Sequence, residues 1–328
     1  MHSQLQAIAQ VISSCLPVFL LIFLGWLSVH LHYVDKSAKT ICSTLVSHYV
    51  FPALLFVHTA TTSPAQVFNG RWMLAFALSM GALWLVSFLM NRTVLKCDLK
   101  QSTMQAMLCS FPNMGGMGVP FLILLLGPAS TISVAVANFV VALTLIPGTI
   151  FLLELSDSLA TGAKVDYQTV LRALKNSLMK PMFIGVALGV IASLSHATQW
   201  LPTFIFNTGK IMSDACNFIS LFAVGVALHG VTLKLNAGLW VNLGLKSLFA
   251  PLISWVMVFA LGLQGASAQT LIFLLAMPTA TNATILAYQW HVQETEASSL
   301  YLLSTALSIV VLPALMLLMR AFISGIAL

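Results

Sequence analysis

Two short segments of the 328-residue chain place helix-breaking residues next to small polar ones. Residues 112–120 contain three glycines and two prolines, and residues 278–284 contain one proline, three threonines and an asparagine. A helix that breaks at such a segment leaves backbone N–H groups unpaired, and the helix that starts after it carries partial positive charge at its N-terminus. Because such groups bind anions, for example carboxylates, we expect an anion-binding site where the two segments meet.

The candidate substrate-binding residues are the small, polar and helix-breaking residues of these segments. They are Asn113, Gly115, Gly116, Gly118, Pro120, Pro278, Thr279, Thr281, Asn282 and Thr284. Pro120 suits the first turn of a helix that restarts after the break, where no N–H needs a helical partner. Asn282 suits the N-cap of the second restarted helix, because its side chain accepts a hydrogen bond from a first-turn N–H. The alternative is a pair of kinks that only shape helix packing.

Patterns typical of catalysis or metal binding do not accompany these segments. The sequence contains no HExxH, GxSxG, P-loop or GxGxxG pattern. We therefore expect no catalytic residue, no cofactor and no metal ion.

The amino-acid composition indicates that the elements carrying the two segments are surrounded by lipid. The chain is 59% apolar and 7% charged, with a mean hydropathy of +0.98, whereas a soluble domain carries about 25% charged residues. So few charges exclude a soluble enzyme, a disordered chain and a disulfide scaffold. The basic residues lie between the apolar runs, so they predict membrane orientation and no nucleic-acid partner.

The apolar runs predict an all-α polytopic membrane protein with ten spans, each of about 20 residues. Their ranges are 8–29, 40–60, 72–90, 103–126, 132–153, 181–194, 203–228, 243–263, 268–290 and 298–320. The loop 156–180 divides the chain into five-helix repeats, 1–155 and 181–328. Because five is odd, the two halves insert in opposite orientations, as in the inverted repeats of secondary transporters. The interrupted segments lie in spans four and nine, near the bilayer midplane.

Basic residues predict the orientation of the chain in the membrane. One side of the predicted membrane has Lys36, Lys39, Arg92, Lys96, Lys100, Lys164, Arg172, Lys175, Lys180, Lys234 and Lys246. The other side has Arg71, Lys210 and Arg320. The positive-inside rule then predicts a cytoplasmic (inner) membrane protein with a cytoplasmic loop 156–180 and both termini outside.

Several motifs follow one another along nearly the whole chain. They are Pro112-Asn113, Gly118-Val119-Pro120, Leu126-Gly127-Pro128-Ala129-Ser130, Leu221-Phe222-Ala223-Val224-Gly225, Ala276-Met277-Pro278 and Glu296-Ala297-Ser298-Ser299. With these motifs the chain resembles the auxin efflux carrier family, especially its bacterial members related to malonate carriers. The resemblance implies two inverted repeats whose spans four and nine cross at the substrate site. It also implies a dimer-forming scaffold of spans 1, 2, 6 and 7, and a mobile transport domain of spans 3–5 and 8–10 that works as an elevator.

Polar residues inside two other spans are candidates for ion coupling. Lys210, Asp214 and Asn217 share one face of span seven, at i, i+4 and i+7. Asp214 is a candidate proton carrier, and the alternative is a structural ion pair with Lys210. His48 in span two is a candidate proton relay, and the alternative is a hydrogen-bonded core residue.

Other residues predict contacts within the helix bundle. Gly185 and Gly189 form a GxxxG pair, which favours a close contact between two helices. Candidates to line a cavity, or to bond their own helix backbone instead, are Asn138, Tyr301, Ser304, Thr305 and Ser308.

These features predict a secondary transporter that moves a small organic anion, such as a malonate-like mono- or dicarboxylate, by an elevator mechanism. We expect a homodimer in the lipid bilayer, coupled to protons or to the membrane potential. The alternatives are an anion channel, a carrier of another small organic solute and an intramembrane enzyme. A channel needs a continuous pore with charged rings or carbonyl filters, and an enzyme would need a second carboxylate near Asp214; the sequence offers neither.

Overall fold

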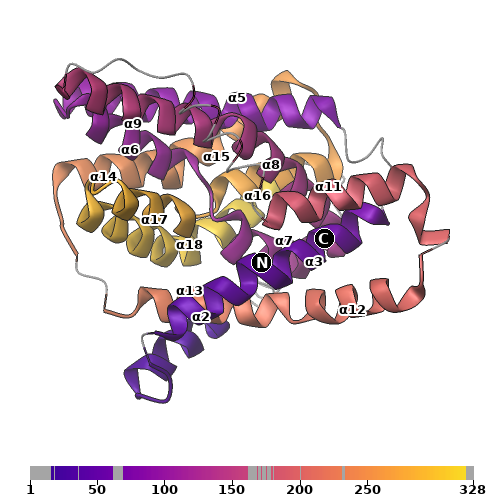
Figure 1. Ribbon diagram of the computed structural model, residues 1–328. Coiled ribbons are helices and arrows are strands. Elements are labelled where there is room, and N and C mark those ends of the chain that lie inside the picture. Colours follow the sequence, from indigo (N-terminus) through magenta and orange to yellow (C-terminus); the bar gives the residue numbers. More distant parts are fainter. Residues whose placement is uncertain are drawn as a thin grey trace.

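The computed structural model describes residues 16–17, 19–35, 37–61, 69–161, 168, 171, 175, 179, 181–199, 201–230 and 233–322. Within these residues all regular structure is helical, and the one β-type contact is an isolated bridge. After a first helix, Phe19–His30, the α-helices are α2 (Ala38–Leu45), α3 (Phe51–Ala60), α5 (Gly70–Leu89), α6 (Leu99–Ser110), α7 (Val119–Leu126), α8 (Thr131–Leu143), α9 (Leu145–Thr161), α11 (Pro181–Leu194), α12 (Thr203–Asp214), α13 (Cys216–Leu228), α14 (Ala237–Gly244), α15 (Ala250–Ala260), α16 (Gly265–Ala276), α17 (Thr281–Gln289) and α18 (Glu294–Phe322) (Figure 1).

Four described helices are long and apolar enough to cross a membrane. They are Gly70–Val94, Pro128–Leu159, Ala237–Ala260 and Glu294–Met319. Three of them agree with the predicted spans 72–90, 132–153 and 298–320. Shorter apolar helices lie at Phe19–His30, His48–Val57, Met114–Leu126 and Gly265–Ala276. The structure is thus that of a polytopic helical membrane protein, and the number of ten spans stays a prediction.

The ends of two predicted elements differ in the structure. Helix α9 continues to Thr161, so the first residues of the predicted loop 156–180 are helical. The predicted span 243–263 begins earlier, at Ala237, because the Asn236 side chain caps the helix by accepting a hydrogen bond from Leu239 N at 2.8 Å. The first predicted span begins in residues 1–15, which lie outside the described part of the chain.

The longer helix changes the position of one basic residue. We counted Lys246 with the basic residues at one membrane face, and this was wrong. Lys246 lies in the π-helical turn η6 (Leu245–Phe249) between α14 and α15, and its side chain is only 1% exposed. Lys246 is therefore an interior residue of the bundle, and ten basic residues remain on the predicted cytoplasmic side.

One group of helices packs through glycines. A methyl group on Gly185 of α11 would lie 2.5 Å from Pro52 O of α3, and one on Gly189 would lie 2.7 Å from Thr59 Cβ. This confirms the close contact that the GxxxG pair predicted. Gly25 of the first helix likewise faces Phe222 O of α13, and Gly225 of α13 faces Ile22 O of the first helix, so a side chain on either glycine would collide with a carbonyl oxygen.

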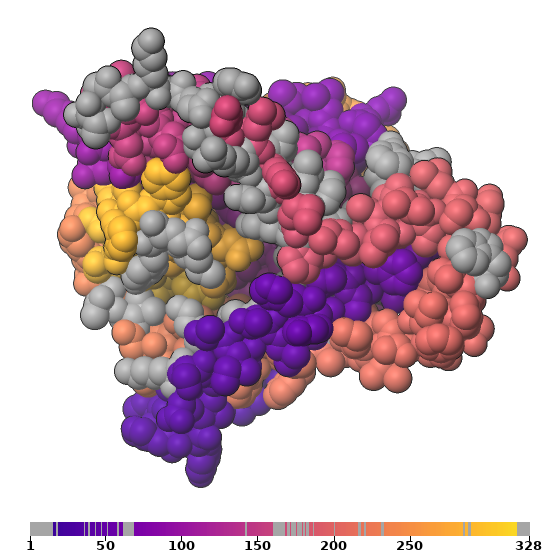
Figure 2. All heavy atoms as spheres, in the orientation of Figure 1, coloured from indigo at the N-terminus to yellow at the C-terminus, as the bar shows by residue number. Residues whose placement is uncertain are grey.

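This first group forms the lower and right-hand parts of Figure 1, with α2, α3, α11, α12 and α13. In Figure 2 its indigo N-terminal segment projects from the body of the molecule. The turn that follows the first helix is exposed, with Tyr33 at 81%.

The second group contains α5–α9 and α14–α18 and holds most of the buried core. Helix α5 packs against α6 and α15, and α15 packs against α16. Phe121 and Phe273 meet edge to face in this core, with ring centroids 5.5 Å apart. The core fixes helices α6 and α16, which lead into the two interrupted segments.

Helix starts recur at a nearly constant spacing in the two halves of the chain. Helix α14 begins at Ala237, 167 positions after the start of α5 at Gly70. Helix α16 begins at Gly265, 166 positions after the start of α6 at Leu99. The recurrence is what two copies of one helical unit would produce, and their inverted orientation stays a prediction.

Candidate functional site

Both predicted interruptions are present in the structure. Helix α6 ends at Ser110, and the chain becomes helical again at Met114 in the π-helical turn η3 (Met114–Gly118), which leads into α7. Helix α16 ends at Ala276, and the chain becomes helical again at Thr281 in α17. Between these helices the backbone is extended, with ψ of 103° at Phe111 and 146° at Met277.

The two extended segments cross and are joined by backbone hydrogen bonds. Asn113 N donates to Pro278 O at 2.8 Å, and Ala280 N donates to Phe111 O at 2.9 Å. Together these bonds form an antiparallel bridge between Pro112 and Thr279. We call the bridge and its flanking residues, 111–114 and 278–281, the crossing.

Asn113 starts the helix on one side of the crossing. Its Oδ1 accepts a hydrogen bond from Gly116 N at 3.1 Å, so Asn113 is the N-cap of η3. The side chain is only 4% exposed, and its Nδ2 has no hydrogen-bond partner among the described residues. Pro120 lies in the first turn of α7, as we expected, and the π-helical turn η3 precedes it from Met114.

Helix α18 supports the second side of the crossing. Thr279 N donates to Ser304 Oγ at 3.1 Å, and Thr281 Oγ1 donates to the Tyr301 hydroxyl at 3.4 Å. Thr279 Oγ1 is completely buried and, within the described part of the chain, lacks a hydrogen-bond partner. Asn282 is not the N-cap that we expected, because α17 already begins at Thr281; its side chain is exposed.

The remaining residues of the two segments pack around the crossing. A methyl group on Gly116 would lie 2.8 Å from Asn113 Oδ1 and 3.0 Å from Val224 Cγ2, so η3 fits tightly against α13. Gly118 faces Leu274 of α16 in the same way. Thr284 is buried, and its Oγ1 donates to Ala280 O at 3.5 Å. Gly115 is half-buried, whereas Pro120 and Pro278 are buried.

The candidate coupling residues lie on other helices. Lys210 and Asp214 are exposed on α12, and they do not pair with each other. The ion pairs of the described residues are Lys100–Asp157, Lys234–Glu296 and His291–Glu294. His48 is exposed, and its Nδ1 lies 3.2 Å from Thr44 O. The side chain of Asn217 lies outside the described part of the structure.

A buried polar cluster behind the crossing escaped the sequence analysis. Asn91 Nδ2 donates to Asn242 Oδ1 at 2.9 Å, and Ser87 Oγ donates to the same oxygen at 3.1 Å. The Cys109 thiol donates to Asn242 Oδ1 at 3.2 Å and so connects the cluster to the last turn of α6. The available signal was two asparagines directly beside predicted spans, Asn91 after span 72–90 and Asn242 before span 243–263. Lys246 follows one helical turn after Asn242.

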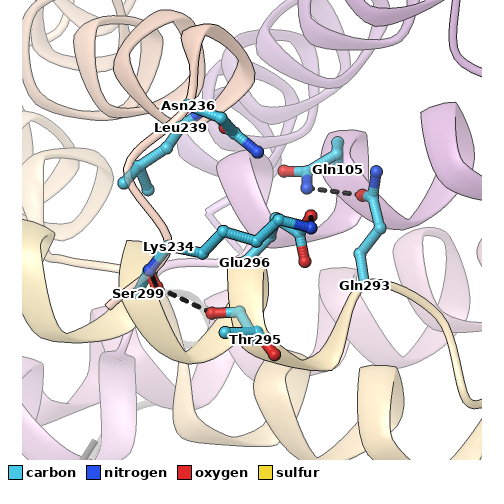
Figure 3. Close-up of polar contacts among 8 residues, drawn as sticks. All are labelled: Gln105, Lys234, Asn236, Leu239, Gln293, Thr295, Glu296 and Ser299. Atoms are coloured by element: carbon cyan, nitrogen blue, oxygen red, sulfur yellow. Dashed lines mark hydrogen bonds and ion pairs between the residues drawn. The ribbon is translucent and has the colours of Figure 1, made fainter. Parts of the chain in front are cut away.

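A second polar group ties the linker between α13 and α14 to α18. Figure 3 shows Lys234 and Glu296 side by side, with Gln105 of α6 facing Gln293. Lys234 Nζ lies 2.6 Å from Glu296 Oε1, and Lys234 N donates to Ser299 Oγ at 2.8 Å. Gln105 Nε2 donates to Gln293 Oε1 at 2.5 Å. These contacts hold the linker, α6 and α18 together.

The geometry is typical of one class of membrane protein. Backbone that is extended in the interior of a helical bundle, between half-helices, is a feature of the substrate sites of secondary transporters. The chain belongs to the membrane transport protein family, whose sequence pattern matches residues 10–316. This confirms the resemblance to auxin efflux carriers.

Two relatives cover most of the chain. A Rhizobium meliloti (strain 1021) protein named "Putative malonate transporter" is 26% identical over 326 residues, which are 95% of this chain and 97% of that protein. An Escherichia coli (strain K12) protein named "Uncharacterized transporter YfdV" is 23% identical over 287 residues, covering 86% of this chain and 88% of that protein. Both names describe membrane transporters and neither describes an enzyme.

Proposed function

We propose that this membrane protein is a secondary transporter that binds a small organic anion, a mono- or dicarboxylate such as malonate, at the crossing. One observation carries the proposal: two buried polar groups, Asn113 Nδ2 and Thr279 Oγ1, have no hydrogen-bond partner among the described residues. They belong to the two chain segments that the bridge joins.

The energetics favour a ligand at these groups. Leaving a buried donor unpaired costs about 1–3 kcal/mol, and a hydrogen bond to a charged acceptor contributes about 1.5–3 kcal/mol. The amide of Asn113 and the hydroxyl of Thr279 are both able to donate. The first turns of η3 and α17 also start at the crossing and bring partial positive charge to it. A carboxylate, with two acceptor oxygens and a negative charge, matches this set of groups.

The arrangement of the helices supports an elevator mechanism. The first helix, α2, α3, α11, α12 and α13 would form the scaffold, and α5–α9 with α14–α18 would form the moving transport domain that contains the crossing. The contact of Gly116 with Val224 of α13 lies between these two parts. The recurrence of helix starts after 166 and 167 positions supports the repeats 1–155 and 181–328 on which such a mechanism depends.

We further propose a cytoplasmic (inner) membrane location with both termini outside, and a homodimer formed through the scaffold. The orientation rests on the basic residues of the predicted loops. The malonate-like substrate class rests on the donor set at the crossing and on the name of the Rhizobium meliloti relative.

Substitutions at the crossing test this function in proteoliposomes. Asn113→Asp keeps an oxygen to cap Gly116 N and replaces the free Nδ2 donor with a second oxygen, which repels a carboxylate. Thr279→Val removes the free hydroxyl. We expect each variant to weaken malonate binding by about tenfold or more, as the loss of one charged hydrogen bond implies. In the absence of malonate, Thr279→Val should keep the thermal stability of the wild type, whereas the buried carboxylate of Asn113→Asp should lower it.

Thr103→Val is the matched control, because Thr103 is buried but its Oγ1 already donates to Leu99 O of its own helix. Its malonate affinity and uptake should equal those of the wild type. Wild-type affinity in both crossing variants would contradict the proposed site. Steady, non-saturating anion currents in planar bilayers would contradict a carrier and indicate a channel.

A further inference from the structure

Lys246 is a buried lysine in the middle of a membrane-spanning helix, and the described residues provide no counter-charge for it. It is the tenth of the 24 residues of Ala237–Ala260 and is 1% exposed. Its Nζ has no hydrogen-bond partner in the described residues, and Lys246 takes part in none of the ion pairs between them. An unpaired charge at this depth is costly and usually marks a functional site.

The elements around η6 provide no acid to neutralise Lys246. The turn packs against α5, α6, α14, α15, α16 and α18. Of these, α14, α15 and α16 contain no titratable side chain. The titratable or charged residues of the other three are Arg71, Lys100, Cys109, Glu294, Glu296, Tyr301 and Arg320. Both acids of α18 are already paired, Glu294 with His291 and Glu296 with Lys234, so the neighbouring titratable group is the Cys109 thiol.

The position of Cys109 relates Lys246 to the crossing. Cys109 lies in the last turn of α6, and its thiol donates to Asn242 O at 3.4 Å, one turn before Lys246. The C-terminus of α6 carries partial negative charge, which favours a cation nearby. Half-helix C-termini and unwound carbonyls hold the coupling ions of other transporters. Through Cys109, Lys246 is therefore close to the end of α6 that favours a cation, and α6 leads into the crossing whose helix N-termini favour an anion.

We propose that Lys246 is the proton-binding coupling site of this transporter, so that a proton moves together with the organic anion. The proposal rests on the proposed function. In a site of low dielectric constant without a counter-charge, the neutral amine costs less than the ammonium ion. An anion at the crossing supplies negative charge and favours the ammonium ion. The amine takes its proton from water on the side where the anion binds and returns it to water on the other side.

Two substitutions separate coupling from transport. Lys246→Met keeps a chain of similar length without a proton-binding group, and Lys246→Arg keeps a charge that is never released. In proteoliposomes with the membrane potential clamped, we expect wild-type malonate uptake to follow an inward proton gradient and to acidify the lumen. Both variants should keep malonate–malonate exchange and lose gradient-driven uptake by about tenfold or more.

Lys175→Met is the control, because Lys175 is an exposed lysine outside the helices that surround η6; it should show wild-type coupling. Lumenal acidification in the wild type that disappears in Lys246→Met supports the inference. Wild-type malonate uptake without a change in lumenal pH overturns it, whether or not the variants fold, and so does gradient-driven uptake by a folded Lys246→Met. Absence of both exchange and uptake for malonate and other carboxylates would instead overturn the proposed function, and the coupling site with it.

Discussion

Gly116 determines how closely the Asn113 amide fits against helix α13. A methyl group at this position would press on Asn113 Oδ1 at 2.8 Å and on Val224 Cγ2 at 3.0 Å. The Asn113 amide can move more easily than Val224, so it would rotate away and its free Nδ2 would leave the crossing. The absence of a side chain at residue 116 is therefore part of the proposed binding site.

Gly116→Ala should weaken malonate binding by about tenfold, because it displaces one donor to a charged ligand. Titration of purified protein followed by thermal shift measures the affinity. Gly81→Ala is the control, since its added methyl group would meet no atom within 4 Å. Equal malonate affinities in the two variants would show that the position of the Asn113 amide does not matter.

Cys97 lies outside the membrane-spanning helices, so the reactivity of its thiol can be followed by chemical labelling. It lies between η2 (Met90–Val94) and α6. Burial, and then the nearby carboxylates of Asp98 and Glu296, raise the pKa of the Cys97 thiol. A raised pKa means that less thiolate is present at neutral pH, so the thiol reacts slowly there.

In a variant that keeps Cys97 as its single cysteine, maleimide labelling should be slower than that of an exposed reference thiol at pH 7. The rate should rise with pH as the thiolate fraction grows. Labelling of intact cells also reports the orientation: a membrane-impermeant maleimide should fail where a permeant one succeeds. Rapid labelling from outside would overturn the predicted cytoplasmic position of this turn.

At the scale of elements, glycines set the distance between α11 and α3. A methyl group on Gly189 would approach Thr59 Cβ at 2.7 Å and Phe56 O at 2.9 Å, and part of that contact is backbone, which cannot rotate away. Gly189→Ala should therefore destabilise the fold by about 1–3 kcal/mol, the usual cost of overpacking. Thermal unfolding in detergent measures the change.

Gly148→Ala provides the comparison for this helix contact, because its added methyl group meets nothing within 4 Å and Gly148 lies within helix α9. It should be neutral or slightly stabilising. If Gly189→Ala unfolds at the same temperature as Gly148→Ala, helices α11 and α3 lie farther apart than in the structure.

The ion pair that attaches the α13–α14 linker to α18 should contribute little to stability. The Lys234 side chain is 55% exposed, and exposed pairs contribute about 0–1 kcal/mol. Lys234→Met should leave the unfolding temperature nearly unchanged. Hydrogen exchange of the linker amides should nevertheless accelerate, because the Lys234 side chain no longer holds the linker on α18. Unchanged exchange would mean that the bond from Lys234 N to Ser299 Oγ is sufficient.

Some structural features could be predicted from the sequence, and others could not. Prolines and glycines predicted both interruptions, since they act through local backbone geometry. The pairing of Pro112 with Thr279 could not be predicted from the sequence, because it depends on long-range packing. Burial of Lys246 was missed since the cap at Asn236 starts α14 six residues before the predicted span. The i, i+4 spacing of Lys210 and Asp214 is compatible with an ion pair, but an exposed pair gains too little to form reliably.

At the scale of the whole molecule, the two halves of the chain depend on each other at one place. The hydrogen bonds of the crossing join residues 111–113 to residues 278–280, which are far apart in sequence. Ser304 of α18 completes the second side. Neither half alone contains both free donors, Asn113 Nδ2 and Thr279 Oγ1.

The crossing therefore makes the proposed anion site a late product of biosynthesis. Ribosomes must have synthesised the chain beyond Ser304, and both halves must have inserted into the membrane, before this substrate site can form. A cell that supplies the substrate during synthesis would then favour completed molecules over stalled ones, and the ligand would act as a folding aid for the final step of assembly.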